Sequence, residues 1–135
     1  MIIKINPDLE KGKSIYGLVQ SRKSAMPSLK QVGFPTVVAE NYYEIIKELI
    51  VVSLLVDGLK AVGGNAHKDL IERFSKYTVL NNQEIAIIQD LRIKRNKSLY
   101  EGKQIEKIYL DNNENNLIEI MAKLEKYVKE RLGEK

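Results

Sequence analysis

The sequence predicts an all-α protein, an up-and-down bundle of four long helices plus a short one, in a single domain that spans residues 1–135. Apolar residues recur along most of the chain at the three- and four-residue spacing of amphipathic helices. Asn, Pro and Gly stand where these patterns begin and end. With 44% hydrophobic and 30% charged residues, the chain has the composition of an ordinary globular protein with one core.

The first helix is expected from about Pro7 to about Met26. Asn6 can accept hydrogen bonds from the first free N–H groups, and a proline is tolerated at a helix start because no intrahelical donor is needed there. Pro27 should end or kink this helix, because proline lacks the backbone N–H and its ring clashes with the preceding turn. The segment from Gly33 to Thr36 then forms a turn.

The second helix, from about Val37 to Lys60, is predicted to be the core element of the chain. Residues Leu49 to Val56 are apolar on all sides apart from Ser53, so other helices or a second copy of the chain must cover them. We therefore expect either a central position or a dimer contact. β-Branched residues are frequent enough here for a strand to be considered, but the length of the run favours a helix.

Two further helices are expected in the middle of the chain. A turn from Gly63 to Asn65 ends the second helix, and a short helix follows from Ala66 to Lys76. Asn81 and Glu84 have the spacing of a capping box, so they should start another long helix.

That helix should stop near Tyr100 to Gly102. The stretch from Gly102 to Asp111 has no clear helical face and is expected to be an extended or irregular connection. Asp111 to Glu114 then reads as a capping box for the last helix, which should end just before Gly133.

The residue content argues against several kinds of site. Without cysteine there is no disulfide framework and no thiolate nucleophile, and one histidine cannot build a zinc site alone, so we expect no metal and no cofactor. The run from Ile45 to Val56 is too short to cross a membrane. The start of the chain lacks the features of a signal peptide, so we expect the protein in the cytoplasm. The net charge of +4 is compatible with an anionic partner.

The helix that follows Asn81 carries two arginines where apolar side chains are expected. At about 100° per residue, Arg92 and Arg95 fall within one apolar stripe. A buried guanidinium stays charged, so each arginine needs a carboxylate of the protein or an anion from outside, unless it extends to solvent. Asp57 is the first candidate for an internal partner, and Glu40 is the alternative. The stripe consists of Ile85, Ile88, Leu91 and Leu99.

The same helix and the residues after it form the most basic stretch of the chain. Phosphate is the anion whose geometry a guanidinium fork matches best. In the last helix, by contrast, basic residues alternate with glutamates, as is usual on a solvated surface. We therefore expect a phosphate-binding patch around residues 90–103, where only Asp90 and Glu101 accompany the basic residues Arg92, Lys94, Arg95, Lys97 and Lys103.

Three short motifs point to a known family. They are Tyr42-Tyr43 early in the second helix, the junction from Gly63 to His67, and Arg95-Asn96 followed by Tyr100 near the end of a later helix. Together they make the chain resemble, over nearly its whole length, the HEPN family (higher eukaryotes and prokaryotes nucleotide-binding domain). The resemblance implies a HEPN-like bundle that binds nucleotide or RNA as a homodimer. Many HEPN domains have a histidine at the position of Tyr100, and the active members cut RNA without a metal.

The resemblance also implies which residues act. A groove lined by Arg92, Arg95, Asn96 and Tyr100 would bind the ligand, and Arg95 and Tyr100 would be catalytic only if the protein is a ribonuclease. Tyrosine, with an ordinary pKa of about 10, is a poor base at neutral pH compared with histidine. Its phenol can still donate to phosphate or stack on a nucleobase, and the alternative is a ring that merely packs at a helix end. His67, the only histidine, is expected to cap or pack rather than carry the chemistry.

Three functions are therefore considered. The first is a binding module for nucleotide or RNA, which we rank first because the missing histidine counts against cleavage while the arginines still need an anion. The second is a metal-independent endoribonuclease of toxin or defence type. The third is a protein-interaction partner of a minimal nucleotidyltransferase, as the resemblance implies for many HEPN proteins.

Overall fold

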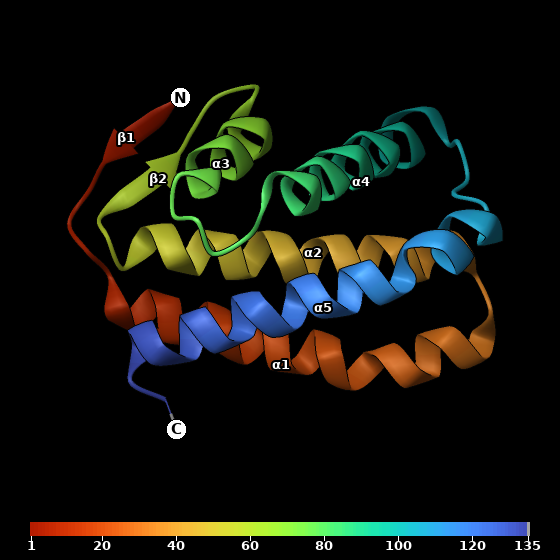
Figure 1. The fold of residues 1–135 in the computed structure, drawn as a ribbon, viewed down its shortest axis with the longest axis horizontal. Coiled ribbons are helices and arrows are strands. Elements are labelled where there is room, and N and C mark those ends of the chain that lie inside the picture. The colour runs from red at the N-terminus through yellow and green to blue at the C-terminus, as the bar shows by residue number, and fades with distance from the viewer. Residues whose placement is uncertain (135) are drawn as a thin grey trace.

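Five helices and one pair of short strands make up the part of the chain that the computed structural model describes, residues 1–134 (Figure 1). Four long helices and a short one confirm the predicted all-α bundle. Within this part of the chain, no helix has the combined length and apolarity that a bilayer-spanning segment requires. The elements, in order, are β1 (Ile2–Lys4), α1 (Leu9–Val32), α2 (Pro35–Leu55), β2 (Leu59–Ala61), α3 (Ala66–Ser75), α4 (Asn82–Glu101) and α5 (Lys107–Leu132).

Helix α2 lies at the centre of the bundle and contacts all four other helices (Figure 1). Its apolar second half is closed to solvent, because Leu49, Ile50, Val52 and Leu54 are each 0% exposed. Burial of each such side chain contributes about 1.5–3 kcal/mol of hydrophobic free energy. The predicted central position is confirmed. The chain itself covers this stretch, so its burial does not require the dimer contact that was the alternative.

The second helix is shorter than predicted, because α2 ends at Leu55 and not at Lys60. Gly58 adopts a positive φ of 72°, and a Cβ there would lie 2.6 Å from the carbonyl oxygen of Ile5. This turn redirects the chain into β2, which pairs antiparallel with β1 at the N-terminus. The strand pair was not predicted, since it joins segments far apart in the sequence that show no local strand pattern.

Helix α1 continues through Pro27 to Val32, so the prediction that it extends only to about Met26 is wrong. Contacts after the proline compensate for the backbone hydrogen bond that proline cannot donate. Leu29 packs against the core, and the ammonium group of Lys30 lies 2.8 Å from a carboxylate oxygen of Glu114 on α5. Gly33 then ends the helix in a left-handed conformation.

Helix α5 begins at Lys107, so the irregular connection predicted up to Asp111 is too long. Helical geometry from Lys107 allows Tyr109 and Leu110 to be buried in the core. Glu114 is not a capping residue but accepts a 2.7 Å hydrogen bond from the hydroxyl group of Tyr42. Burial of two apolar side chains thus outweighs the local capping signal that begins at Asp111. The predicted end of this helix before Gly133 is confirmed.

Candidate functional site

Helix α4 positions most of the side chains predicted to form the site. The predicted capping box fixes its start, because the Asn81 side chain accepts from the Glu84 backbone N–H at 2.8 Å and the Glu84 side chain accepts from the Asn81 N–H at 3.0 Å. Ile88 and Leu91 are fully buried and hold the helix against the core. The helix contacts both α2 and α3. Its second half therefore lies within reach of the turn that precedes α3.

A cavity of about 310 Å³ lies between this part of α4 and the first turn of α3. The structure thus brings the four predicted ligand-binding residues, Arg92, Arg95, Asn96 and Tyr100, into one concave surface. No carboxylate is among its lining residues, whereas three of them are basic. The other lining residues are Gly63, Gly64, Asn65, Ala66, His67 and Lys68.

Arg95 is already paired within the protein. Its Nη2 atom lies 3.0 Å from Oε1 of Glu44, and its Nη1 donates to the Asn96 side chain at 3.3 Å. The guanidinium carbon lies 5.4 Å from the centre of the Tyr43 ring, and the side chain is only 17% exposed. Of the alternatives predicted for this arginine, the structure shows a carboxylate of the protein as its partner, and that carboxylate is Glu44 from α2.

Neither predicted carboxylate partner contacts the arginines of α4, so this part of the prediction is wrong. Asp57 lies beyond the end of α2, where it binds the guanidinium group of Arg131 and accepts a hydrogen bond from Tyr77. Glu40 has no ion pair within residues 1–134, although it lines the same shallow depression as Arg95. Glu44 is one helical turn from Glu40 and is the residue whose carboxylate reaches Arg95.

The Glu44 carboxylate also holds Lys47. Burial alone would raise the pKa of Glu44, but the hydrogen bond from Lys47 and the charges of Lys47 and Arg95 hold that pKa below its ordinary value. Glu44 is therefore ionised at neutral pH and neutralises much of the charge on Arg95.

Arg92 differs from Arg95 in having a neutral partner only. Its Nε donates to Oε1 of Gln89 at 2.7 Å, and it forms no ion pair with any residue of the described chain. The side chain is half-buried and lines the cavity. A partly desolvated guanidinium group that has no carboxylate partner attracts an anion strongly.

The last turn of the predicted stripe points to solvent. Leu99 is 51% exposed and Tyr100 is 77% exposed, so the inward orientation predicted for Leu99 is wrong. Tyr100 lies at the rim of the cavity with its ring accessible. An exposed ring at this place can stack on a flat ligand, which a packed ring could not do.

His67 joins this cavity, although the sequence favoured a packing or capping role for it. Its Nδ1 lies 3.1 Å from the hydroxyl group of Tyr43, a fully buried side chain of α2. Burial raises the pKa of Tyr43 to about 12, so the phenol keeps its proton. The phenol donates to Nδ1 in the tautomer that carries its proton on Nε2, and it accepts from Nδ1 in the other tautomer. Only in the first tautomer is Nε2 a hydrogen-bond donor.

The charge state of His67 follows from its surroundings. Burial, together with the positive charges of Lys47 and Arg95, lowers the pKa of His67. The imidazole is therefore neutral at pH 7. The sequence signal for this residue was its place directly after the Gly63-Gly64 turn, whereas its contact with Tyr43 depends on the tertiary fold.

The first turn of α3 adds free backbone donors to the cavity. The Asn65 side chain does not cap this helix, and the N–H groups of His67 and Lys68 have no acceptor within the described residues 1–134. Such N–H groups carry the positive end of the helix dipole and favour a negative ligand. These N–H groups lie beside the same cavity as Arg92. The helix dipole and the charge of Arg92 therefore both favour an anion in this cavity.

Searches of protein-family models, curated proteins and solved structures found no match to this chain. The resemblance to the HEPN family therefore stays a prediction from the sequence motifs. Within residues 1–134, no three His, Asp or Glu side chains gather closely enough to hold a metal ion.

The depressed pKa of His67 predicts a specific dependence of stability on pH. Below the ordinary histidine value of 6.5, the unfolded chain binds a proton that the folded chain resists, so the free energy of unfolding should fall as the pH is lowered. The loss should be a fraction of the roughly 1.4 kcal/mol per pH unit that one proton can supply, because solvent reaches part of the ring. Urea unfolding at pH 7.5 and at pH 5.5 measures this loss in the free energy of unfolding.

His67→Gln is the matched control, because glutamine keeps a side-chain acceptor for Tyr43 but does not titrate. The variant should lose less stability than the wild type over this pH interval. Carboxylates such as Glu44, whose pKa is held below 4.5, titrate outside the interval in both proteins. Identical losses in the two proteins would show that His67 is not held neutral by the fold.

Proposed function

We propose that this chain binds the phosphate of a nucleotide or RNA in the cavity between α3 and α4, with little or no catalysis. The observation that carries the proposal is the shared cavity. Arg92, Asn96 and Tyr100 of α4 line it together with His67 and the unpaired N–H groups at the start of α3. Cytoplasmic location is part of the proposal, because nucleotides and RNA are abundant there.

Each group has a distinct part in the proposed binding. Arg92 lacks a carboxylate and would hold the phosphate oxygens through its guanidinium fork. The N–H groups of His67 and Lys68, with Nε2 of His67, would donate to the same anion. Tyr100, at the exposed rim, would stack on the base. Arg95 would mainly shape the site, since Glu44 already neutralises it.

Ribonuclease activity is the second candidate, because His67 lies in the same cavity as Arg95. A neutral imidazole is the type of group that accepts a proton from a 2′-hydroxyl. Tyr43 occupies Nδ1 in either tautomer, so only Nε2 could act as a base, and only when the imidazole proton is on Nδ1. We rank binding above cleavage because Tyr100 stands where the active HEPN domains have a histidine.

The partners are proposals that follow from the resemblance. A homodimer finds support in two exposed apolar side chains of α4, Ile93 at 44% and Leu99 at 51% exposure, which a second copy could cover. Such a dimer would bring two cavities close together. A minimal nucleotidyltransferase partner is proposed on the resemblance alone.

Substitution of Arg92 or Arg95 by alanine should weaken phosphate binding more than Lys126→Ala does. For Arg92, a charge-assisted hydrogen bond from a partly desolvated guanidinium contributes about 1.5–3 kcal/mol, which corresponds to roughly tenfold to a hundredfold in affinity. The loss for Arg95 should be smaller than for Arg92, because Glu44 already neutralises its charge. Lys126 is exposed on α5 among mixed charges, so its loss should change affinity by less than about fivefold. Isothermal titration with a nucleoside monophosphate and with a short single-stranded RNA, at fixed salt, measures the affinity of each variant.

The two arginines should also differ from each other. Arg92→Ala should weaken binding without lowering the melting temperature much. Arg95→Ala should also destabilise the fold, because it leaves the half-buried Glu44 with Lys47 as its one remaining ion-pair partner among residues 1–134. Equal losses of affinity in the Arg92, Arg95 and Lys126 variants would place the binding outside this cavity.

Tyr100→His tests whether only a base is missing for cleavage. Wild-type protein should cut RNA weakly or not at all in the presence of a metal chelator. If the cavity positions the 2′-hydroxyl, imidazole at position 100 should raise cleavage by on the order of tenfold to a thousandfold. Cleavage of a fluorescently labelled RNA, measured with chelator present, gives the rate.

Two controls separate the outcomes of this experiment. Tyr100→Phe should leave the wild-type rate unchanged, and His67→Gln should do the same if His67 acts only as a donor. Wild-type cleavage that either change abolishes would overturn the ranking and make the protein an enzyme that uses that residue.

A further inference from the structure

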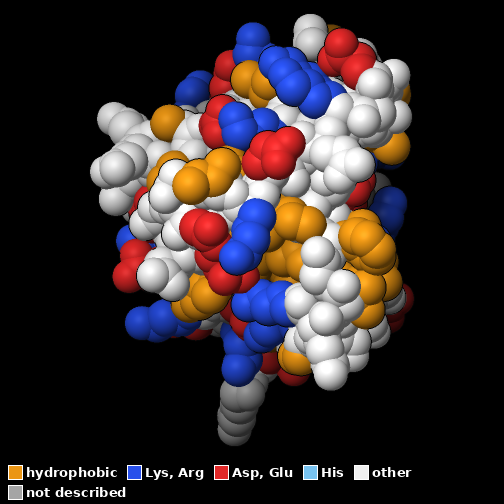
Figure 2. All heavy atoms as spheres, turned by 90° about the vertical axis from the view of Figure 1, so that its right-hand side faces the viewer, with side chains coloured by type: hydrophobic (Ala, Val, Ile, Leu, Met, Phe, Trp, Pro, Cys, Tyr) orange, Lys and Arg blue, Asp and Glu red, His pale blue; other side chains and the backbone are white. Residues whose placement is uncertain are grey.

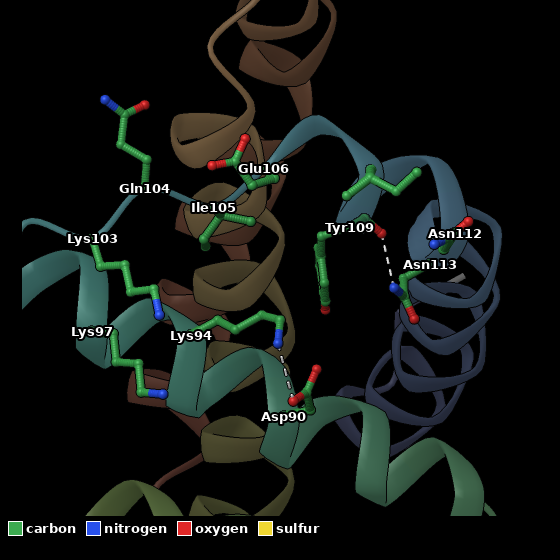
Figure 3. A pocket seen from close by; sticks show the side chains of 11 residues that line it. Asp90, Lys94, Lys97, Lys103, Gln104, Ile105, Glu106, Tyr109, Asn112 and Asn113 are labelled. Carbon is green, nitrogen blue, oxygen red and sulfur yellow. Dashed lines mark hydrogen bonds and ion pairs between the residues drawn. The ribbon is translucent and has the colours of Figure 1, made fainter.

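A second cavity, of about 440 Å³, lies on another side of α4. It is enclosed by the second half of α4, the connection to α5 and the first turn of α5 (Figure 3). None of its lining residues also lines the cavity between α3 and α4. The groups that carry the following inference are three apolar or aromatic residues and three lysines, Ile105, Ile108, Tyr109, Lys94, Lys97 and Lys103.

Tyr109 has a hydroxyl group that the protein leaves without a partner. The residue is only 8% exposed, and its hydroxyl oxygen is buried with no hydrogen bond to any of residues 1–134. Figure 3 shows the ring standing between α4 and α5, with the hydroxyl end directed toward Lys94 and Asp90. A buried polar group without a partner is unfavourable, so a ligand group that accepts its proton would be stabilised there.

The phenol stays protonated and therefore remains a donor. Burial, with a smaller effect from the charge of Asp90, raises the pKa of Tyr109 to about 12. The Asp90 carboxylate makes no hydrogen bond with this hydroxyl and lies 3.4 Å from the ammonium group of Lys94.

The lysines give the cavity positive charge beside an apolar surface. Lys94 lies 5.5 Å from the centre of the Tyr109 ring, and Lys97 and Lys103 have no carboxylate within ion-pair distance in the described chain. Two carboxylates, Asp90 and Glu106, also line the cavity, so three lysines leave a net charge of +1. Figure 2 looks onto the end of the bundle where α4 connects to α5, and apolar side chains there lie next to lysine or arginine side chains.

We propose that this cavity binds a small aromatic anion, a flat ring that carries a carboxylate or a phosphate. The ring would pack against Ile105, Ile108 and the Tyr109 ring, and the volume lies within the range of small-molecule pockets. The anionic group would accept a hydrogen bond from the Tyr109 hydroxyl beside the ammonium group of Lys94, and Lys97 and Lys103 would add positive charge to the same cavity. This site is independent of phosphate binding between α3 and α4.

A matched pair of probes tests the proposal, 2-naphthoate and its uncharged analogue 2-naphthamide. Both have the same ring system, but only the first is an anion. Titration of ¹⁵N-labelled protein followed by amide resonances should show 2-naphthoate shifting residues 103–109 at lower concentration than 2-naphthamide. Equal affinities for the two probes, no binding of 2-naphthoate up to millimolar concentration, or shifts centred on residues 63–68 would each overturn the proposal.

Variants identify the groups that bind. Tyr109→Phe removes only the hydroxyl and should weaken 2-naphthoate binding about fivefold to tenfold, while the melting temperature stays the same or rises because an unpaired buried group is lost. Lys97→Gln and Lys103→Gln should each weaken it by roughly twofold to fivefold, and Lys126→Gln should have no effect. Unchanged affinity in Tyr109→Phe, or an equal loss in Lys126→Gln, would contradict the assignment.

Discussion

Burial of the apolar half of α2 is the constraint on which the rest of the structure depends. A helix without a polar face must be covered on every side, and the four other helices pack around it. The candidate site is a consequence, because α4 and the start of α3 meet on this central helix. Tyr43 and Glu44 of α2 then hold His67 and Arg95 in place. The cavity is thus positioned by the core, which limits the reorganisation needed to bind an anion.

Much of the fold could be predicted because its signals are local. The capping box at Asn81 and the glycine after α5 each act within a few residues of the helix end that they define. The errors arise where distant contacts outweigh a local signal. Pro27 does not end α1 because Leu29 and Lys30 find partners beyond it. The pairing of β1 with β2 joins the N-terminus to residues 59–61, and no local pattern reveals such a partner.

The candidate site could be predicted as a set of residues but not as a network of contacts. Helical spacing placed Arg92, Arg95 and Asn96 on the same face of one helix. The same spacing could not show that Glu44 neutralises Arg95 while Arg92 has only a neutral partner, because that depends on the packing of α4 against α2. The place of His67 in the cavity likewise depends on the packing of α3 against α2 and could not be predicted from spacing.

The central claim is that an anion binds between Arg92 and the first turn of α3. A titration of ¹⁵N-labelled protein with AMP, followed by backbone amide and arginine Nε signals, tests it most directly. The account predicts that the largest changes occur at the amides of His67 and Lys68 and at Nε of Arg92, while the amide of Lys126 stays still. Changes spread along α5, or none up to millimolar AMP, would contradict it.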